Sequence, residues 1–284
     1  MEGKRLSLSN LDKVMYPAVG FTKGQVIDYY TRVAPALLPH LRDRPLTLKR
    51  YPNGVDRGHF YEKRCPSHAP DWVRRERVDG IEYCICDDVP TLVWLANLAD
   101  LELHPSLSLA DDIARPTTMA FDLDPGEPAG IVECCQVAFL LRDALDQLGL
   151  RSFAKTSGSK GIQVYVPLNV DEVDYDSGTK ALSHALARHL EAAHPALIVS
   201  QQRKDLRRGK VLIDWSQNDE HKTTVCVYSL RAREQPTVST PVSWEELEDP
   251  DSLGFEASDV LERIEEHGDL FAPMAELRQD LPDL

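Results

Sequence analysis

Two aspartates stand two residues apart at the end of an apolar stretch, in TTMAFDLDPGE at residues 117–127. On a β-strand, Asp122 and Asp124 project from the same face, and the Pro125-Gly126 pair then turns the chain. Two carboxylates this close repel each other unless a cation neutralises them. Oxygen ligands suit Mg²⁺ or Mn²⁺, so the pair is a candidate metal site. The alternative is a turn capped by aspartates, which favour such positions.

A third aspartate ends another apolar stretch in the same manner. Asp214 follows VLI in KVLIDWSQN, residues 210–218. Three carboxylates at two strand ends suit a two-metal phosphoryl-transfer site, in which one ion activates the attacking oxygen and the other stabilises the leaving one. The same set would also suit a metal-dependent phosphodiesterase. The alternative for Asp214 is a turn carboxylate bonded to Ser216 or Asn218.

A loop rich in glycine and serine lies between these two strands. In KTSGSKGIQVYVPL, residues 155–168, the stretch from Ser157 to Lys160 leads directly into a strand. Such a loop can direct backbone N–H groups, hydroxyls and a lysine at phosphates. No helix follows, so it is not a P-loop. Taken alone, the loop is better interpreted as the turn of a hairpin.

Basic and aromatic residues alternate in LKRYPNGVDRGHFYEKR, residues 48–64. Lysines and arginines that track phosphates, combined with exposed aromatic side chains that stack on unpaired bases, are typical of single-strand binding. The alternative is that Phe60 and Tyr61 belong to the core, since one of two adjacent strand residues normally faces inward.

The net charge of −14 hides a gradient along the 284 residues. Residues 1–77 carry a net +7 and residues 203–233 a net +4, whereas residues 234–284 carry −13. An acidic chain binds DNA when its charge is segregated in this way, so the total excludes no nucleic-acid partner. The composition is that of an ordinary globular protein.

Neither a membrane span nor a signal peptide is predicted, so we expect a cytoplasmic protein that associates with the bacterial nucleoid and not with a membrane. In that location the six cysteines are expected to be reduced thiols. Cys65, His68, Cys84 and Cys86 offer a weak zinc pattern, and whether they bind zinc stays open.

Helical and strand patterns are mixed irregularly along the chain. A helix is predicted over residues 24–41, with Thr22 as its N-cap and Pro35 kinking or splitting it. Apolar stretches that include residues 117–123 and 223–230 predict strands. We therefore expect an α+β fold, with mixed or antiparallel sheets flanked by helices. The catalytic body is predicted over residues 1–233, as two closely packed lobes that meet near residue 120, with the acidic segment 234–284 packed on it.

Several motifs together resemble a known family. FDLDPG, TSGSKGI, VYVPL, VLIDWSQN and KTTVCVYSLRA occur in the order found in the polymerase domain of bacterial ligase D, a branch of the archaeo-eukaryotic primase superfamily. LSLSNLDKVMYPAVGFTKGQVIDYY and LTLKRYPNGVDRGHFYEK are also similar, so the resemblance covers roughly residues 5–270.

The resemblance implies a primase-polymerase fold and a template-dependent nucleotidyltransferase. Such an enzyme fills gaps and extends ends during double-strand-break repair by end joining, prefers NTP over dNTP, uses two Mn²⁺ or Mg²⁺ ions, and works beside Ku and an ATP-dependent ligase. The implied catalytic and metal-binding residues are Asp122, Asp124 and Asp214. The implied nucleotide-binding residues are Lys49, Ser157, Gly158, Lys160, Gln163 and Arg231. The implied DNA 5′-phosphate site is Asn10, Lys13 and Lys23, and the template-binding residues are Phe60, Tyr61, Lys63 and Arg207.

One position departs from the family pattern. The motif normally reads SGSKG-x-H, and Gln163 stands here in place of the histidine. Glutamine carries no titratable charge, so catalysis or nucleotide choice is expected to differ. This departure keeps open a second hypothesis, a catalytically weakened DNA-end-binding module that recognises the 5′-phosphate.

Overall fold

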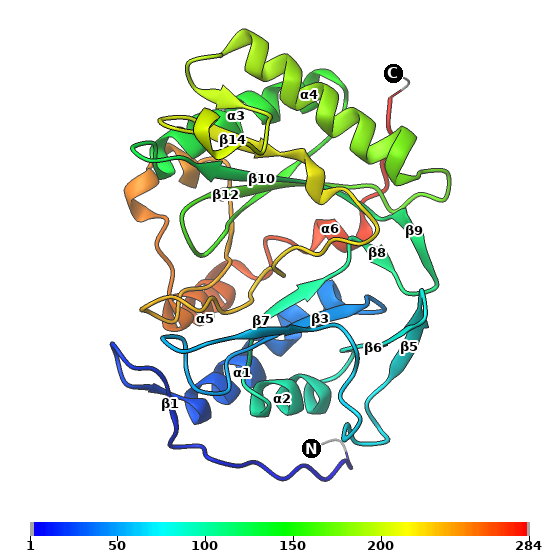
Figure 1. The fold of residues 1–284 in the computed structure, drawn as a ribbon, viewed down its shortest axis with the longest axis vertical. Helices are drawn as coiled ribbons and strands as arrows, with labels where there is room; N and C mark the ends of the chain where they lie inside the picture. The colour runs from blue at the N-terminus through cyan, green and yellow to red at the C-terminus, as the bar shows by residue number, and fades with distance from the viewer. Residues whose placement is uncertain (1–2, 283–284) are drawn as a thin grey trace. The chain divides into compact units, whose positions relative to one another are not determined.

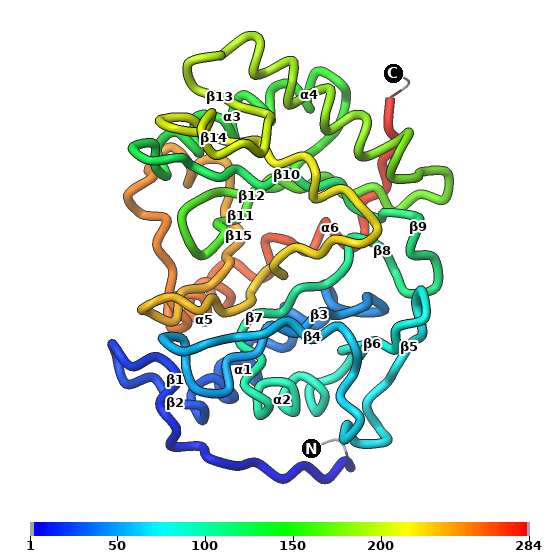
Figure 2. The backbone as a smooth tube through the Cα atoms, in the orientation of Figure 1, coloured from blue at the N-terminus to red at the C-terminus, as the bar shows by residue number. Residues whose placement is uncertain are grey.

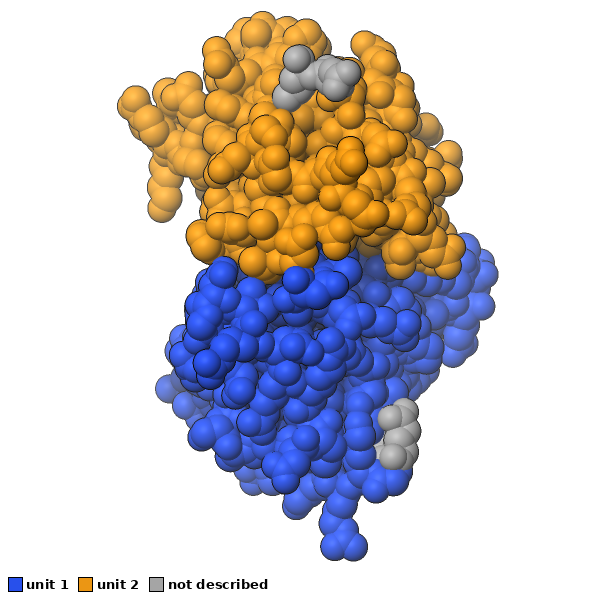
Figure 3. Space-filling model, turned by 90° about the vertical axis from the view of Figure 1, so that its right-hand side faces the viewer, with its two compact units in different colours: residues 1–111, 223–240, 255–269 blue, residues 112–222, 241–254, 270–284 orange. Residues whose placement is uncertain are grey.

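The computed structural model describes residues 3–282 and separates the chain into two compact units, traced in Figure 1 and Figure 2 and coloured in Figure 3. Unit 1 holds the residues up to Asp111, together with residues 223–240 and 255–269. Unit 2 holds residues 112–222, 241–254 and 270–284. The acidic segment 234–284 therefore contributes residues to both units.

Unit 1 contains an antiparallel sheet in the strand order β4 (Phe60–Glu62), β3 (Leu46–Arg50), β6 (Ile81–Cys84) and β5 (Arg75–Val78). A fifth strand, β7 (Asp100–Pro105), also pairs with β3. The short strands β1 (Val14–Tyr16) and β2 (Phe21–Thr22) form a separate pair, and β8 spans Ser108–Leu109. The sheet brings residues that are far apart in sequence onto neighbouring strands.

Three helices of unit 1 are α1 (Lys23–Leu41), α2 (Val89–Asn97) and α5 (Ala257–His267). Figure 1 shows α1 and α2 side by side, and the two helices are in contact. The predicted N-cap is confirmed, because the Thr22 hydroxyl accepts from the Gln25 backbone and the Gln25 side chain accepts from the Thr22 backbone. Of the kink or split expected at Pro35, the split is wrong, since α1 continues through Pro35 and Pro39.

Unit 2 contains a six-stranded sheet in the order β13 (Ile198–Val199), β14 (Val211–Asp214), β10 (Thr118–Pro125), β12 (Ile162–Pro167), β11 (Phe153–Thr156) and β15 (Pro241–Val242). Only β13 and β14 are parallel among these neighbouring pairs. Helices α3 (Ile131–Gln147) and α4 (Lys180–Ala193) pack on β10, as Figure 1 shows, and the unit also includes β9 (Asp112–Pro116) and α6 (Pro273–Glu276). The mixed and antiparallel sheets confirm the predicted α+β class. Within residues 3–282, no helix has both the length and the apolar character needed to cross a membrane.

Residues 223–230 do not form the predicted strand. Thr224 and Cys226 donate backbone hydrogen bonds to Pro105 and Leu103 of β7, which is the spacing of a strand edge. The pairing then stops at Tyr228, whose φ of 64° lies in the left-handed region. The segment is buried, and the apolar alternation, which predicted a strand, missed the turn.

Two of the six cysteines are not the reduced thiols that we expected. Cys65, which follows β4, and Cys84 at the end of β6 form a disulfide, with their Cα atoms 4.9 Å apart. The Cys65 backbone N–H donates to the Glu82 carbonyl, which holds Cys65 next to β6. Cys86, Cys134, Cys135 and Cys226 are free and buried.

Candidate active site

The three predicted aspartates lie together on the sheet of unit 2. Asp122 and Asp124 are on β10, and Asp122 is directly opposite Asp214 of the antiparallel strand β14. Residues opposite each other in such a pair share a face of the sheet, and so do residues two apart on one strand. Asp122 and Asp214 are largely buried, whereas Asp124 is exposed. Strand register therefore gathers the three carboxylates on one face.

The proximity of these groups affects the protonation of Asp122. Burial, the Asp124 charge and, to a smaller extent, the Asp214 charge raise the pKa of Asp122 to about 6, against a hydrogen bond from Gln163 that acts in the opposite direction. A bound cation would relieve this repulsion, and a set of carboxylate oxygens is chemically suited to Mg²⁺ or Mn²⁺. Across residues 3–282, no group of three or more His, Cys, Asp or Glu side chains is arranged so that it could hold a metal ion as the side chains stand.

The turn that follows Asp214 holds the Asp214 carboxylate in place through hydrogen bonds. Ser216 donates to Oδ1 of Asp214 from its backbone N–H (3.0 Å) and its hydroxyl (2.7 Å), and the Gln217 side chain donates to Oδ2 (2.9 Å). The turn contact with Ser216, which was the alternative interpretation of Asp214, is therefore present. Each carboxylate oxygen can accept more than one bond, so these contacts leave capacity for a cation.

Asn218, which the sequence analysis considered only as a partner of Asp214, instead attaches this turn to β10. Its fully buried side chain accepts from the Ala120 N–H (2.9 Å) and donates to the Ala120 carbonyl (2.7 Å). It also donates to the Trp215 carbonyl (2.9 Å). The side chain thus continues the β10–β14 pairing beyond Asp214, and it holds the turn in register with the strand that carries Asp122.

A glycine lets the loop with Arg207 approach the aspartates. A Cβ atom on Gly126 would lie 2.1 Å from the backbone oxygen of Arg207, so only glycine allows this contact. Nη1 of Arg207 then lies 4.0 Å from Oδ2 of Asp124, and Nη2 donates to the Gln202 carbonyl (2.9 Å). The structure therefore places Arg207, predicted to bind template, next to one of the predicted metal ligands.

The Gly-Ser-Lys loop folds on its own serine. The Ser157 hydroxyl accepts from the backbone N–H groups of Ser159 (3.2 Å) and Gly161 (3.1 Å), and Gly158 has a left-handed φ of 66°. Lys160 is exposed and pairs with Glu127 at 3.2 Å. Because an exposed ion pair contributes little free energy, Lys160 can exchange Glu127 for a bound anion at little cost. Because Asp122 and Gln163 are directly paired across β10 and β12, the loop begins next to the aspartates.

We predict that Gly161→Ala destabilises the protein by about 1–3 kcal/mol, because the new methyl group must be accommodated by the backbone. A Cβ atom at Gly161 would lie 2.0 Å from the carbonyl oxygen of Leu123 on β10. Urea unfolding measures the loss. Gly254→Ala is the matched control, since its Cβ meets nothing within 4 Å. Equal stability of the two variants would contradict the close β10–β12 approach.

Unit 1 holds a second polar cluster, which is centred on Glu102 of β7. Oε2 of Glu102 accepts from Lys49 Nζ (3.0 Å) and lies 3.0 Å from His104 Nε2 and 3.5 Å from Arg231 Nε. Oε1 accepts from the Tyr51 hydroxyl (3.2 Å) and from the backbone of Ala232 (3.0 Å). Glu102 is 2 % exposed and directly opposite Lys49 in the sheet. One carboxylate thus collects three basic side chains.

The charges in this cluster shift the pKa values of Glu102 and His104. Burial by itself would raise the pKa of Glu102, but the His104 hydrogen bond and the Arg231 and Lys49 charges hold it well below its usual range. Burial lowers the pKa of His104, and Arg231 and Lys49 act in the same direction. Lys49 and Arg231 were predicted from the sequence as site residues, whereas Glu102 and His104 were not. The alternation in LELHP, which places both side chains on one face, was the available signal.

The predicted template-binding aromatic residues are both at the surface. Phe60 is 43 % exposed and Tyr61 is 58 % exposed, so neither belongs to the core. The Arg50 guanidinium lies 5.1 Å from the centre of the Phe60 ring, and Lys49 Nζ lies 5.5 Å from that of Tyr61. Lys63 follows in the same exposed segment. Each exposed ring beside a cation is suited to stacking on a base, and as consecutive residues of β4 the two rings lie on opposite faces of the sheet.

The residues of the predicted 5′-phosphate site also lie close together. Lys23 is 5 % exposed and donates to the Ser9 carbonyl (2.7 Å), while Lys13 donates to the Pro52 carbonyl (2.6 Å). Burial and the neighbouring charge of Lys13 lower the pKa of Lys23. Asn10, at a left-handed φ of 53°, accepts from the Lys13 backbone. Two nearby cations that form no salt bridge with an acid among residues 3–282 are suited to bind an anion.

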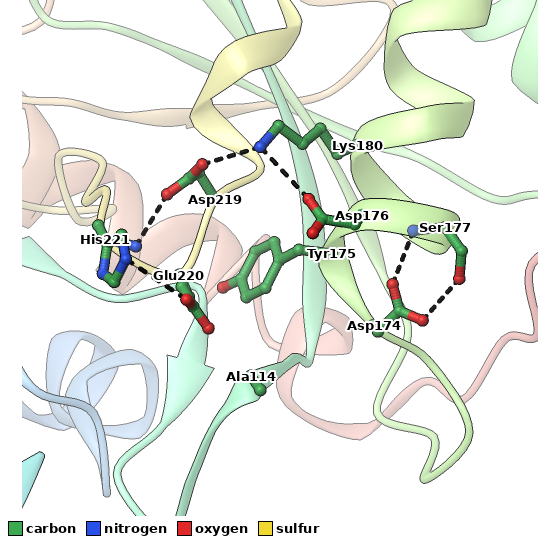
Figure 4. Close-up of a pocket in the computed structure, with 9 residues that line it drawn as sticks. All are labelled: Ala114, Asp174, Tyr175, Asp176, Ser177, Lys180, Asp219, Glu220 and His221. Carbon is green, nitrogen blue, oxygen red and sulfur yellow. Dashed lines mark hydrogen bonds and ion pairs between the residues drawn. The ribbon is translucent and has the colours of Figure 1, made fainter. Parts of the chain in front are cut away.

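A cavity of about 490 Å³ in unit 2 contains none of the predicted site residues (Figure 4). Its charged groups are paired with one another, since Lys180 Nζ lies 3.0 Å from Asp219 and 3.4 Å from Asp176. Asp219 also accepts from the His221 backbone (3.0 Å). These contacts secure the far end of the turn that begins at Asp214, so we assign them a structural role.

Comparison with known proteins identifies relatives across nearly the whole chain. A family model described as LigD, primase-polymerase domain, matches residues 22–271. The multifunctional non-homologous end joining protein LigD of Mycolicibacterium smegmatis is 42 % identical over 277 residues, which cover 95 % of this chain and 36 % of that protein. The bifunctional LigD of Bacillus subtilis is 33 % identical over 279 residues, covering 98 % and 45 %. This chain thus spans about a third to a half of the length of these relatives.

A solved structure shows the same similarity in three dimensions. The polymerase domain from Mycobacterium tuberculosis ligase D, in complex with DNA, matches with a TM-score of 0.88 and 41 % sequence identity. The match covers 98 % of this chain and 99 % of that one.

Proposed function

The chain belongs to the LigD primase-polymerase family, and from that premise we propose that it is a template-dependent nucleotidyltransferase that fills gaps and extends ends in double-strand-break repair by non-homologous end joining. The observation that carries the proposal is the register of unit 2, which gathers Asp122, Asp124 and Asp214 on one face of a sheet. Phosphoryl transfer needs charge neutralisation and in-line positioning more than covalent chemistry. Three carboxylates with bound metal ions would provide both.

The three aspartates would hold two Mn²⁺ or Mg²⁺ ions. When bound, the ions would neutralise charge on the reacting phosphate and lower the pKa of the primer 3′-hydroxyl, so no separate side-chain base is needed. The carboxylates contribute the oxygens: Asp214 is oriented by Ser216 and Gln217, and Asp122 accepts a hydrogen bond from Gln163. Arg207, next to Asp124, is assigned to the template and to the pairing of DNA ends.

The triphosphate of the incoming nucleotide is assigned to basic side chains and to the Gly-Ser-Lys loop. Lys49 and Arg231 are held by Glu102 and retain N–H donors for phosphate oxygens. Ser157, Gly158 and Lys160 supply a tight loop with an exposed ammonium group. A set that grips a triphosphate favours polymerisation over the phosphodiesterase alternative.

The nucleic-acid partner is proposed to be a DNA end or gap with a 5′-phosphate. The solved relative is in complex with DNA, and its similarity to this chain supports the assignment. Phe60 and Tyr61 would stack on template bases, with Lys63 nearby. Ku and an ATP-dependent ligase are the expected partners in repair, because the curated relatives are named as multifunctional or bifunctional end-joining proteins.

Primer extension on a DNA gap with a 5′-phosphate tests the function. NTP and dNTP are supplied in parallel reactions, each with Mn²⁺ or Mg²⁺, and template-directed addition with a preference for NTP is expected. Binding of the gapped DNA without any extension would contradict the polymerase proposal and favour the end-binding module. Hydrolysis of the primer in place of extension would favour the phosphodiesterase.

We predict that Lys23→Ala removes most of the preference for 5′-phosphorylated gaps and leaves extension on an open template nearly unchanged. The physical reason is that a buried ammonium group near a second cation gains most when an anion binds. The ratio of extension rates with and without the 5′-phosphate measures the effect, and Lys13→Ala should act in the same way. Lys4→Ala, which removes a lysine paired with Asp88, is the control. Equal losses on both substrates would show that the assignment is wrong.

A further inference from the structure

A row of polar side chains crosses four strands of the sheet in unit 2. Lys155 of β11 is opposite Gln163 of β12, Gln163 is opposite Asp122 of β10, and Asp122 is opposite Asp214 of β14. Lys155 is 1 % exposed and Gln163 is 5 % exposed. A buried lysine in line with two of the predicted metal ligands is a feature that the proposed mechanism does not use.

The hydrogen bonds along this row run in one direction. Lys155 Nζ donates to Oε1 of Gln163, and Nε2 of Gln163 donates to Oδ1 of Asp122 (3.1 Å). The Tyr165 hydroxyl is a second donor to the same Oε1 (3.4 Å). An ammonium group can only donate, so Lys155 determines which end of the Gln163 amide faces it, and the NH₂ end is left to face Asp122. The amide orientation therefore follows from the chemistry of its neighbours.

We propose that Gln163 is a positioning residue that orients Asp122 for metal binding, and that Lys155 acts through Gln163 by fixing the direction of its amide. The inference rests on the proposed function, because it concerns Asp122 as a metal ligand. It also gives the departure at position 163 a role. A neutral histidine accepts at one ring nitrogen and donates from the other, as the glutamine amide does, so both residues complete the same chain of bonds.

Mn²⁺ alone is the probe, and its affinity for the full chain is measured by electron paramagnetic resonance without DNA or nucleotide. Partners that orient a ligand typically affect metal affinity about tenfold or more when removed, so Gln163→Leu is expected to weaken Mn²⁺ binding about 10-fold. Gln163→His is expected to stay within about 2-fold of the unaltered protein, because it restores both hydrogen bonds. Lys4→Met, which removes a positive charge from unit 1, is the control.

Lys155→Met separates orientation from simple electrostatics. Loss of a positive charge near a cation site would by itself tighten Mn²⁺ binding. Weaker binding, by about 3-fold or more, is therefore the result expected if Lys155 acts by orienting Gln163. In the double variant Lys155→Met with Gln163→Leu, no weakening beyond that of Gln163→Leu is expected, because the residue through which Lys155 acts is already gone.

The outcomes distinguish this inference from the proposed function. If Gln163→Leu binds Mn²⁺ as tightly as the unaltered protein, or if the losses of the two single variants add in the double variant, the inference is wrong while the polymerase assignment stands. If the unaltered protein neither binds Mn²⁺ nor extends primers, the assignment of Asp122 as a metal ligand is wrong, and the inference that rests on it is wrong as well. Thermal unfolding of each variant without metal shows whether the fold is retained, and recovery in Gln163→His excludes a general packing defect.

Discussion

Asp122→Asn should reduce primer extension by at least about 100-fold, which is the usual cost of removing a group that stabilises transition-state charge. An amide keeps the shape of the carboxylate and loses its charge, so the variant removes a proposed metal ligand without creating a cavity. Asp124→Asn is expected to act in the same way. Extension that survives in the variant carrying both changes would overturn the metal-site assignment.

Asp122→Asn should also stabilise the metal-free protein, so one substitution is expected to lower activity and raise stability. The pKa of Asp122 is raised to about 6 in the folded state, by burial first and then by Asp124 and Asp214. A raised carboxyl pKa means that deprotonation disfavours the folded state as pH rises through about 6. At pH 7.5, Asp122→Asn should therefore raise the free energy of unfolding by about 1–3 kcal/mol. This increase should vanish below about pH 4, where the carboxyl is protonated in both the folded and the unfolded state.

Urea unfolding at pH 4 and pH 7.5, run together with the extension assay, measures both effects. Asp205→Asn is the matched control, because Asp205 is exposed and pairs only with Arg203 in the contacts that the structure gives it. It should change neither quantity. An Asp122→Asn variant that is inactive and also less stable at pH 7.5 would attribute the lost activity to the fold and not to the chemistry.

The strand-end aspartates could be predicted from the sequence because their signal is local. The apolar stretch before Asp122, its spacing from Asp124 and the Pro125-Gly126 turn all lie within eleven residues. Their shared face was expected from strand alternation, and the structure has β10 there. The meeting with Asp214 was inferred from its similar position at a strand end, and the register of β10 with β14 provides it.

The cluster around Glu102 could not be predicted because it depends on pairing between distant segments. Glu102 meets Lys49 across two strands 53 residues apart and reaches the backbone of Ala232 across 130 residues. In the sequence, the alternation in LELHP indicates only that His104 shares a face with Glu102, and nothing local indicates Lys49 or Arg231 as partners. The missed turn at Tyr228 has the same origin, because tertiary contacts impose a left-handed φ on a residue whose type does not favour it.

Glu102→Gln should raise the KM for NTP about tenfold or more with a much smaller change in kcat. Removing one partner of a buried charge cluster leaves the others uncompensated. Without the carboxylate, Lys49 and Arg231 repel each other and lose the contacts of 3.0 Å and 3.5 Å that hold them in place. The role proposed for them, binding of the triphosphate before chemistry, predicts a rise in KM, and tenfold corresponds to about 1.4 kcal/mol.

Glutamine has nearly the same volume as glutamate and can still accept from Tyr51 and the backbone of Ala232, so the variant tests charge more than packing. Glu62→Gln is the control, since Glu62 forms a comparable cross-strand ion pair with Arg50 at 2.7 Å outside the cluster. It should leave the KM for NTP unchanged. A preserved preference for 5′-phosphorylated gaps in Glu102→Gln would show that unit 1 is still folded. An unchanged KM in that folded variant would mean that Lys49 and Arg231 are not the triphosphate ligands, because a triphosphate site cannot lose the counter-charge that organises two of its cations without a change in affinity.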